Sequence, residues 1–237
     1  QLGEMFALIG LGESERLQGN YASAQMAIDQ GLTLARALND RFGRITALVG
    51  LSQLHCLLGN LAGALTYVTE LLQILADRDL LPENLVLILD AVAFYMHCSG
   101  QAQQALAYGE QGQQVRKEYV RIQLTLGHIR ASIQDWAAAS IAYQFAVTRY
   151  LQRGNRAMAA EPQAGLAQIA LAQGDLAGAL AQIEAILPIL VEQPHAGFND
   201  PFFIYLTCYR VLNATDDSRA ATLLRQGYDL LQQDAAA

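Results

Sequence analysis

A short motif returns six times along this chain of 237 residues, at nearly regular intervals. It reads Gly-Asn-Tyr-Ala-Ser-Ala at residues 19–24, Gly-Asn-Leu-Ala-Gly-Ala at 59–64 and Gly-Asp-Leu-Ala-Gly-Ala at 174–179, with weaker copies at 100–105, 134–139 and 216–221. The last alanines of the copies lie 40, 41, 34, 40 and 42 residues apart. Such a period indicates tandem units that stack in a row, because one unit alone cannot bury its apolar side. A compact two-domain helical bundle is the alternative, but a bundle need show no fixed period.

Each position of the motif has a physical role at a turn between two helices. Glycine ends a helix in the left-handed conformation without a steric penalty. The Asn or Asp that follows it caps the next helix by accepting hydrogen bonds from its first amides. The alanine one turn later lets two helices approach closely. We therefore predict N-caps at Asn20, Asn60, Asp135, Asp175 and Asp217, whereas Gln101 breaks the rule.

A second position recurs seven residues before each turn, where a small residue follows a large aliphatic one. The small residues are Gly12, Ser52, Ala93, Gly127 and Ala167, and Tyr209 departs from the pattern in the sixth copy. This order, with alanine twelve residues later, resembles the tetratricopeptide repeat, in which the small residue of the first helix packs against the alanine of the second. The resemblance covers nearly the whole chain, although most steps exceed the 34 residues usual in that family.

The resemblance implies an all-α fold, an alpha-alpha superhelix of about six helical hairpins. We expect twelve helices in one repeat domain over residues 1–237, with units at roughly 3–38, 41–78, 83–118, 119–152, 155–191 and 200–234. Pro162 should kink or delay the first helix of the fifth unit. Asp200 and Pro201 read as an N-cap followed by proline at the first helical position, after a long loop over 192–200. The chain starts at Gln1 and ends within a helical pattern, so we expect a fragment of a larger protein.

The bulk composition narrows the possible partners. The net charge is −7 and no basic stripe is present, so direct binding to nucleic acid is not expected. The sequence holds no run of 18 apolar residues that could cross a membrane. The three cysteines, Cys56, Cys98 and Cys208, lie far apart and are predicted to be buried apolar groups in a reducing compartment. These observations predict a cytoplasmic location.

No motif in the sequence indicates catalysis or a cofactor. Gly10-Leu11-Gly12 follows no strand and is better explained by helix packing than by nucleotide binding. His55-Cys56 and His97-Cys98 occupy similar places in adjacent repeats, where two histidines and two cysteines could in principle bind zinc. Neighbouring residues on a helix diverge by about 100°, however, so we predict core cysteines, partly exposed histidines and no metal site.

The tetratricopeptide resemblance implies where a protein or peptide partner would bind. In that family the first helix of each hairpin lines the concave side. The inward positions are Glu13, Arg16, Gln53, Cys56, Asp90, Phe94, His97, Arg121, His128, Gln168 and Arg210. They mix charged, amide and aromatic groups, as a peptide-binding groove does, although each could equally be a solvated helix face. A second candidate is the aromatic segment over residues 198–205, which could anchor a partner or cover the end of the array.

Three functions remain open at this point. The repeats of about 40 residues, rich in Ala, Leu and Gln, are similar to the sensor arrays of bacterial signal-transducing ATPases and transcriptional activators, which implies a protein- or peptide-binding regulatory module. The alternative is a self-associating scaffold, in which exposed apolar faces pair symmetrically. A helical-repeat enzyme would need polar residues that converge in a closed pocket, and the sequence does not indicate one.

Overall fold

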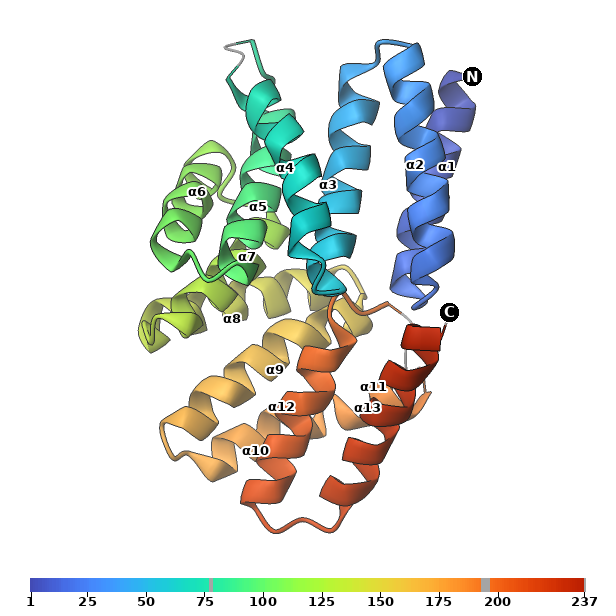
Figure 1. Ribbon diagram of the computed structural model, residues 1–237. Coiled ribbons are helices and arrows are strands. Elements are labelled where there is room, and N and C mark those ends of the chain that lie inside the picture. Colours follow the sequence, from blue (N-terminus) through green and yellow to red (C-terminus); the bar gives the residue numbers. More distant parts are fainter. Residues whose placement is uncertain (77–78, 193–196, 237) are drawn as a thin grey trace. The chain divides into compact units, whose positions relative to one another are not determined.

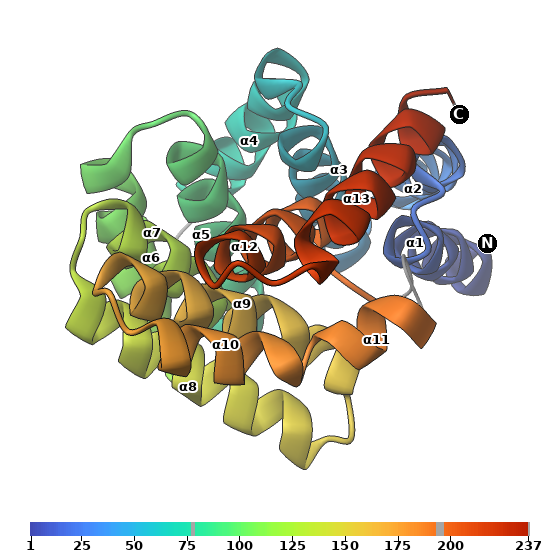
Figure 2. The same cartoon turned by 90° about the horizontal axis from the view of Figure 1, so that it is seen from below.

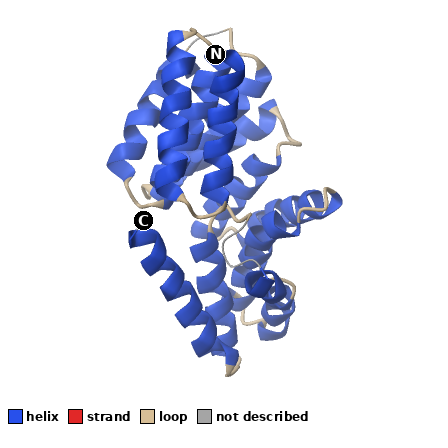
Figure 3. Cartoon of the chain, turned by 90° about the vertical axis from the view of Figure 1, so that its right-hand side faces the viewer, coloured by secondary structure: helices blue, strands red, loops and turns tan. Residues whose placement is uncertain are grey.

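The computed structural model describes residues 1–76, 79–192 and 197–236. In these ranges the secondary structure is helical, with turns and loops between the helices and no strand (Figure 3). The chain divides into two compact units, each described by itself below. The N-terminal unit holds residues 1–16 and 20–129, and the C-terminal unit holds residues 17–19 and 130–237. The predicted all-α class is confirmed, whereas the single repeat domain over 1–237 stays a prediction.

Thirteen helices are found in the described residues, and the second helix of the predicted fifth hairpin is divided in two. The first seven are α1 (Leu2–Leu17), α2 (Tyr21–Ala37), α3 (Arg41–Leu57), α4 (Leu61–Leu75), α5 (Pro82–Cys98), α6 (Ala102–Val115) and α7 (Val120–Ser132). The others are α8 (Trp136–Gln152), α9 (Arg156–Ala172), α10 (Leu176–Glu184), α11 (Leu187–Glu192), α12 (Pro201–Ala214) and α13 (Arg219–Ala236).

Two prolines act differently on the fifth hairpin. Helix α9 begins at Arg156 and continues through Pro162, so the predicted delay of this helix is wrong. The break comes instead at residues 185–186, between α10 and α11. Pro188 explains it, because proline has no amide hydrogen to donate to the carbonyl of Glu184, four residues earlier. The prediction of twelve helices missed this division.

In the N-terminal unit, consecutive hairpins pack against each other. Helices α1 to α4 run antiparallel side by side (Figure 1), and α3 and α4 both contact α5 of the next hairpin. Gly12 shows why a small residue is needed: an added Cβ would lie 2.3 Å from the Ile28 side chain and 2.9 Å from the Ala24 carbonyl oxygen. The first hairpin therefore closes on a small residue facing the motif alanine, as the sequence pattern predicts. Five of its buried apolar side chains belong to a hydrophobic cluster that reaches α5, namely Met5, Ile9, Ile28, Leu32 and Ala35.

In the C-terminal unit, α9 contacts α8, α10 and α12, and α13 packs on α12 (Figure 2). The aromatic segment over residues 198–205, which the sequence offered as a partner anchor, packs in the hydrophobic core of this unit. Phe198 and Tyr205 are buried, while Phe202 and Phe203 are partly buried and pack against the same core. The rings are thus used in packing, as the alternative of covering the end of the array implies, and the anchoring role stays a prediction. The predicted long loop before it lies partly outside the described residues.

Most of the predicted N-caps are confirmed. The carboxylate or amide oxygens of Asn60, Asp135 and Asp175 accept hydrogen bonds from the third amide of the following helix. Asp200 caps α12 in the same way, with Pro201 at its first position. Two side chains, Asn20 and Asp217, behave differently.

Asn20 precedes α2 but makes no side-chain cap. Its amide nitrogen donates instead to the Glu15 carboxylate, at 2.7 Å. Asp217 accepts from the Arg219 amide, two residues ahead, and also pairs with the Arg219 guanidinium. The cap at Asn20 is therefore wrong, and that at Asp217 holds only in altered form.

The left-handed turn position is filled by glycine in four copies of the motif and by a larger residue in the other two. Gly19, Gly59, Gly100 and Gly174 have φ values of 70–82°, as predicted. Gln134 takes φ 63° and Asp216 φ 52° at the equivalent places. A side chain in this conformation costs roughly 1–2 kcal/mol relative to the right-handed region, and glycine avoids this cost.

We expect Gln134→Gly to raise the free energy of unfolding by about 1 kcal/mol, because it relieves the left-handed strain at an exposed site. Urea unfolding followed by circular dichroism would measure it. The matched control is Gly174→Ala, which introduces the same strain and should lower stability by a similar amount. An unchanged midpoint for both variants would contradict the explanation.

Candidate functional site

The inward positions predicted from the sequence lie on α1, α3, α5 and α7 of the N-terminal unit, together with two in the C-terminal unit. On α1, the Arg16 guanidinium is 4% exposed and donates two hydrogen bonds to the Glu13 carboxylate, at 2.6 and 2.9 Å. Glu13 itself is 41% exposed. The buried cation thus holds a partly exposed carboxylate in a fixed position.

A buried network connects α5 and α7. Asp90 is 1% exposed and accepts a hydrogen bond from Thr125 Oγ1 at 2.7 Å and from Arg121 Nε at 3.3 Å. Burial raises the pKa of the Asp90 carboxyl, although the Arg121 charge and the hydrogen bonds from Thr125 and Arg121 act in the opposite direction. The Arg121 side chain is 29% exposed. Asp90 therefore holds a cation whose side chain is partly accessible to solvent.

Electrostatics link this network to α1. Burial acts to raise the pKa of Glu13, but the hydrogen bond and charge of Arg16, together with the charge of Arg121, lower it overall. Glu13 and Arg121 are 108 positions apart in the sequence, so the fold brings two inward positions from the first and fourth hairpins within electrostatic reach. Gln53 is 6% exposed on α3, and its Nε2 has no hydrogen-bond partner among the described residues.

Two histidines from α5 and α7 meet on the same unit. The rings of His97 and His128 stack with centroids 6.3 Å apart and planes inclined by 22°. Burial and the charge of His128 lower the pKa of His97 to about 4, so His97 is neutral at pH 7. Phe94 lies one turn before His97 and is partly buried against the hydrophobic cluster. These three half-buried rings form the less polar part of the predicted face.

The two cysteines of the repeated His-Cys pairs come together, but the histidines do not join them. Cys56 and Cys98 are in contact, and their mutual hydrogen bond and burial raise the pKa of the Cys56 thiol. The His55 ring instead packs at 5.3 Å from the Tyr67 ring. No group of three or more His, Cys, Asp or Glu side chains in the described part of the chain could hold a metal ion. His195 lies outside the described residues.

We expect two of the three thiols to resist alkylation in the folded protein. The Cys56 pKa is raised, and burial raises the pKa of Cys208 to about 12, so the reactive thiolate is scarce at pH 8. Iodoacetamide labelling followed by intact mass should add at most one group to the native chain and three in 6 M guanidinium. Rapid native labelling of Cys208 would contradict its burial.

The remaining predicted positions belong to the C-terminal unit. Gln168 on α9 is half-buried, and Arg210 on α12 is exposed. Sequence reasoning missed Thr125, which donates to Asp90 in the α5–α7 network, and the buried Gln123 on the same helix. Gln123 is buried, accepts from Gln113 and donates to the Lys117 carbonyl. Two buried polar side chains in an otherwise apolar stretch of α7 were the available signal.

The length and hydropathy of the helices can be compared with what a membrane span requires. None of those in the described residues is long and apolar enough to cross a bilayer.

Hairpins of two antiparallel helices, each packed on the next across a small residue and a motif alanine, define a class of helical-repeat proteins. Residues 4–77 match the model of the tetratricopeptide repeat family. No curated protein matches the sequence. The predicted likeness to tetratricopeptide repeats is thus supported by the family match over residues 4–77 and, over nearly the whole chain, by the fold.

Two solved structures show the likeness of fold. BtubC (BKLC) from P. vanneervenii is 17% identical with a TM-score of 0.61, and the alignment covers 93% of each chain. A thermophilic tetratricopeptide repeat protein from Thermus thermophilus, TTC0263, is 18% identical with a TM-score of 0.60. That alignment covers 88% of this chain and 99% of the other. At such identities the likeness concerns the fold alone.

Proposed function

We propose that this chain is a protein- or peptide-binding module, and that its N-terminal unit contacts the partner through the inward side chains of α1, α3, α5 and α7. The observation that carries the proposal is the division of these residues into two layers. Arg16, Gln53 and Asp90 are buried. Glu13 and Arg121 are partly exposed, and they pair with Arg16 and Asp90, respectively. A surface whose polar groups are held by a buried layer loses little entropy when it binds.

The exposed layer suggests the character of the partner. Glu13 and Arg121 offer one charge of each sign, and Phe94, His97 and His128 add aromatic rings, of which that of His97 is neutral at pH 7. A peptide with mixed polar and apolar side chains fits such a surface better than a highly charged one. Cys56 is buried in the hydrophobic cluster and is left out of the contact surface. Gln168 and Arg210 stay as proposed contacts of the C-terminal unit. The proposal assigns no catalytic residue, cofactor or metal.

The test is a selection of peptides from a random displayed library, using the whole chain as bait. Selected peptides are then synthesised and titrated calorimetrically. His128→Ala should weaken their binding at least fivefold if the surface is the site. The matched control is Ile141→Ala, which removes a 72% exposed apolar side chain on α8 and should leave Kd unchanged. If the peptides bind both His128→Ala and Glu13→Gln as tightly as they bind the parent chain, the site lies elsewhere.

We further propose that the module is the sensor or regulatory array of a larger bacterial signalling or transcriptional regulator. The support is the style of the repeats, with steps near 40 residues and a high content of Ala, Leu and Gln. A ligand that binds one arrangement of the hairpins better than another would shift the regulator between states. The open reading frame tests this, because the proposal requires a nucleotide-binding or effector domain in the same polypeptide.

Self-association is a second candidate function, favoured by one observation on α13. Leu224, Tyr228 and Leu231 follow helical spacing and are 47–58% exposed. An apolar stripe of this kind can pair with a copy of itself across a two-fold axis. Light scattering over a range of concentrations tests the idea. A monomer at every concentration, or a dimer unaffected by Leu231→Gln, would eliminate it.

A further inference from the structure

Helix α13 keeps an apolar side that the C-terminal unit leaves exposed. The helix packs on α12, with Leu223 and Leu230 buried in the core of this unit. Leu224, Tyr228 and Leu231 are instead 47%, 58% and 48% exposed. Figure 1 shows α13 beside α12, at the edge of the C-terminal unit. Because successive residues of a helix are rotated by about 100°, the three exposed side chains form one narrow stripe along α13.

Two exposed charges of opposite sign lie next to this stripe, on the side away from α12. They belong to Arg225 and Asp229, and the helical period turns both toward solvent. Neither side chain makes a hydrogen bond or an ion pair with a residue that the structure describes. The two are four positions apart on one helix with the cation first, which is the less favourable order for an ion pair within a helix. Both charges can therefore contact a second molecule.

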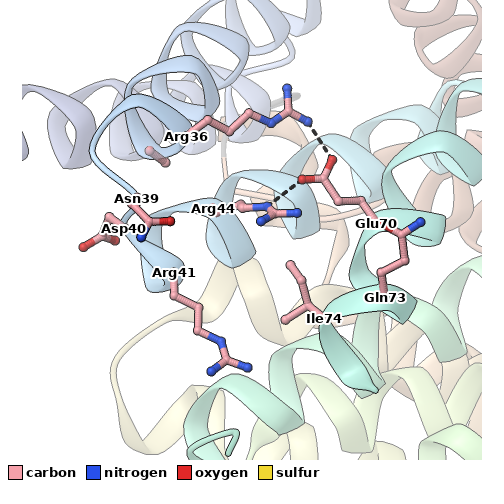
Figure 4. A pocket seen from close by; sticks show the side chains of 9 residues that line it. Arg36, Asn39, Asp40, Arg41, Arg44, Glu70, Gln73 and Ile74 are labelled. Carbon is pink, nitrogen blue, oxygen red and sulfur yellow. Dashed lines mark hydrogen bonds and ion pairs between the residues drawn. The ribbon is translucent and has the colours of Figure 1, made fainter. Parts of the chain in front are cut away.

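Other charges of the protein already pair within the chain. In the N-terminal unit, Glu70 accepts from Arg36 and from Arg44 Nε, both at 2.6 Å (Figure 4). At the start of α13 itself, Arg219 pairs with Glu184 of α10. The two charges beside the stripe differ from these pairs, because they meet no opposite charge among the described residues.

The order of these residues along α13 is nearly symmetric. Leu224 lies four positions before Tyr228, and Leu231 lies three positions after it. Arg225 and Asp229 lie two positions on either side of residue 227. If two copies of α13 run side by side in opposite directions about this centre, leucine meets leucine and each positive charge meets a negative one. A parallel arrangement would place like charges opposite each other, which is unfavourable.

We infer that two copies of this chain pair through antiparallel α13 helices, with Tyr228 near the two-fold axis and Arg225 of each copy facing Asp229 of the other. The inference rests on the self-association proposed above, and it specifies the interface and its direction. A two-fold interface requires a surface patch that complements itself, and this order of residues provides one. The apolar stripe supplies the area that is removed from water, whereas the two ion pairs fix direction and register.

The size of the interface sets the expected affinity. One pair of helices buries less area than a typical stable interface, so we expect a weak dimer with Kd on the order of 1–100 µM. Sedimentation velocity of the whole chain over a range of concentrations measures this Kd. Low ionic strength is used, because salt screens ion pairs between exposed side chains.

Reversal of each charge tests the pairing. Arg225→Glu brings two acids together at both symmetric contacts, and we expect Kd to rise roughly tenfold or more. Asp229→Arg should have the same effect, because it brings two cations together. An equimolar mixture of the two variants should form a heterodimer with Kd within about threefold of the parent value, because both contacts again join opposite charges. Misfolding of either variant cannot produce this recovery.

The matched control is Arg156→Glu, which reverses an exposed charge on α9 and should change Kd by less than about twofold. If the parent chain is monomeric at every concentration, both self-association and this inference fail. If the parent dimerises but neither reversal on α13 changes Kd, self-association stands and the inference is overturned. A mixture that does not recover dimerisation, or equal weakening by Arg156→Glu, also overturns it.

Discussion

Arg121→Met is expected to lower the free energy of unfolding by about 3–5 kcal/mol at neutral pH, because it leaves a buried carboxylate without its cation. Asp90 is 1% exposed, and its carboxylate accepts from the side chains of Thr125 and Arg121. The hydrogen bond from Thr125 remains in the variant, but it cannot offset the removal of a full charge from water. Chemical unfolding followed by circular dichroism measures the loss.

A double-mutant cycle isolates the cause. Asp90→Asn keeps an acceptor for Thr125 and removes the buried charge, so we expect Asp90→Asn combined with Arg121→Met to be more stable than Arg121→Met alone. If the double variant is instead less stable than Arg121→Met, the loss comes from packing of the Arg121 stem. Methionine is chosen because it keeps much of that stem and fills a similar volume.

The pH dependence provides an independent reading of the same network. Burial raises the pKa of Asp90 in the folded chain above its unfolded value of about 3.8, so the folded state binds more protons between these two pKa values. Stability from this group is therefore greatest below the unfolded pKa and falls as pH rises through the folded pKa. Arg121→Met should extend this fall to higher pH, since the charge that favours the Asp90 anion is gone. Asp90→Asn should remove the slope altogether.

Gly165→Ala is the second change for which we expect a large effect, a loss of about 2–3 kcal/mol. A Cβ at this position would lie 2.4 to 2.8 Å from three carbon atoms of the Tyr143 ring. Tyr143 on α8 is fully buried, so its ring has no room to retreat. The steric cost outweighs the gain of about 0.5–1 kcal/mol that alanine brings to a helix interior. Thermal or urea unfolding would show the difference.

Two controls make this prediction specific. Gly10→Ala places the same methyl group in helix α1 with nothing within 4 Å, so it should stabilise the protein slightly. Tyr143→Leu removes the ring carbons that the new Cβ would meet. We expect Gly165→Ala and Tyr143→Leu together to cost less than the sum of the two single changes. Additive costs would mean that the close approach of α8 and α9 is relieved by helix movement instead.

The hairpin pattern was readable from sequence because it depends on local chemistry. Glycine at left-handed turns, Asn60, Asp135 and Asp175 at N-caps, and Gly12 opposite Ala24 each follow from the conformation or volume of one residue. The departures arise where a neighbour competes. Asn20, for example, donates to Glu15 instead of capping α2.

The sequence by itself determined the helices, their pairing and the class of repeat, because these follow from periodicity and from turn chemistry within a few dozen residues. Only the tertiary structure decided which polar residues are buried supports and which are open to a partner. The contact of Asp90 with Arg121, the stacking of His97 on His128 and the convergence of Arg36 and Arg44 on Glu70 each join separate helices. Such meetings depend on how helices of adjacent hairpins pack, which no local pattern encodes.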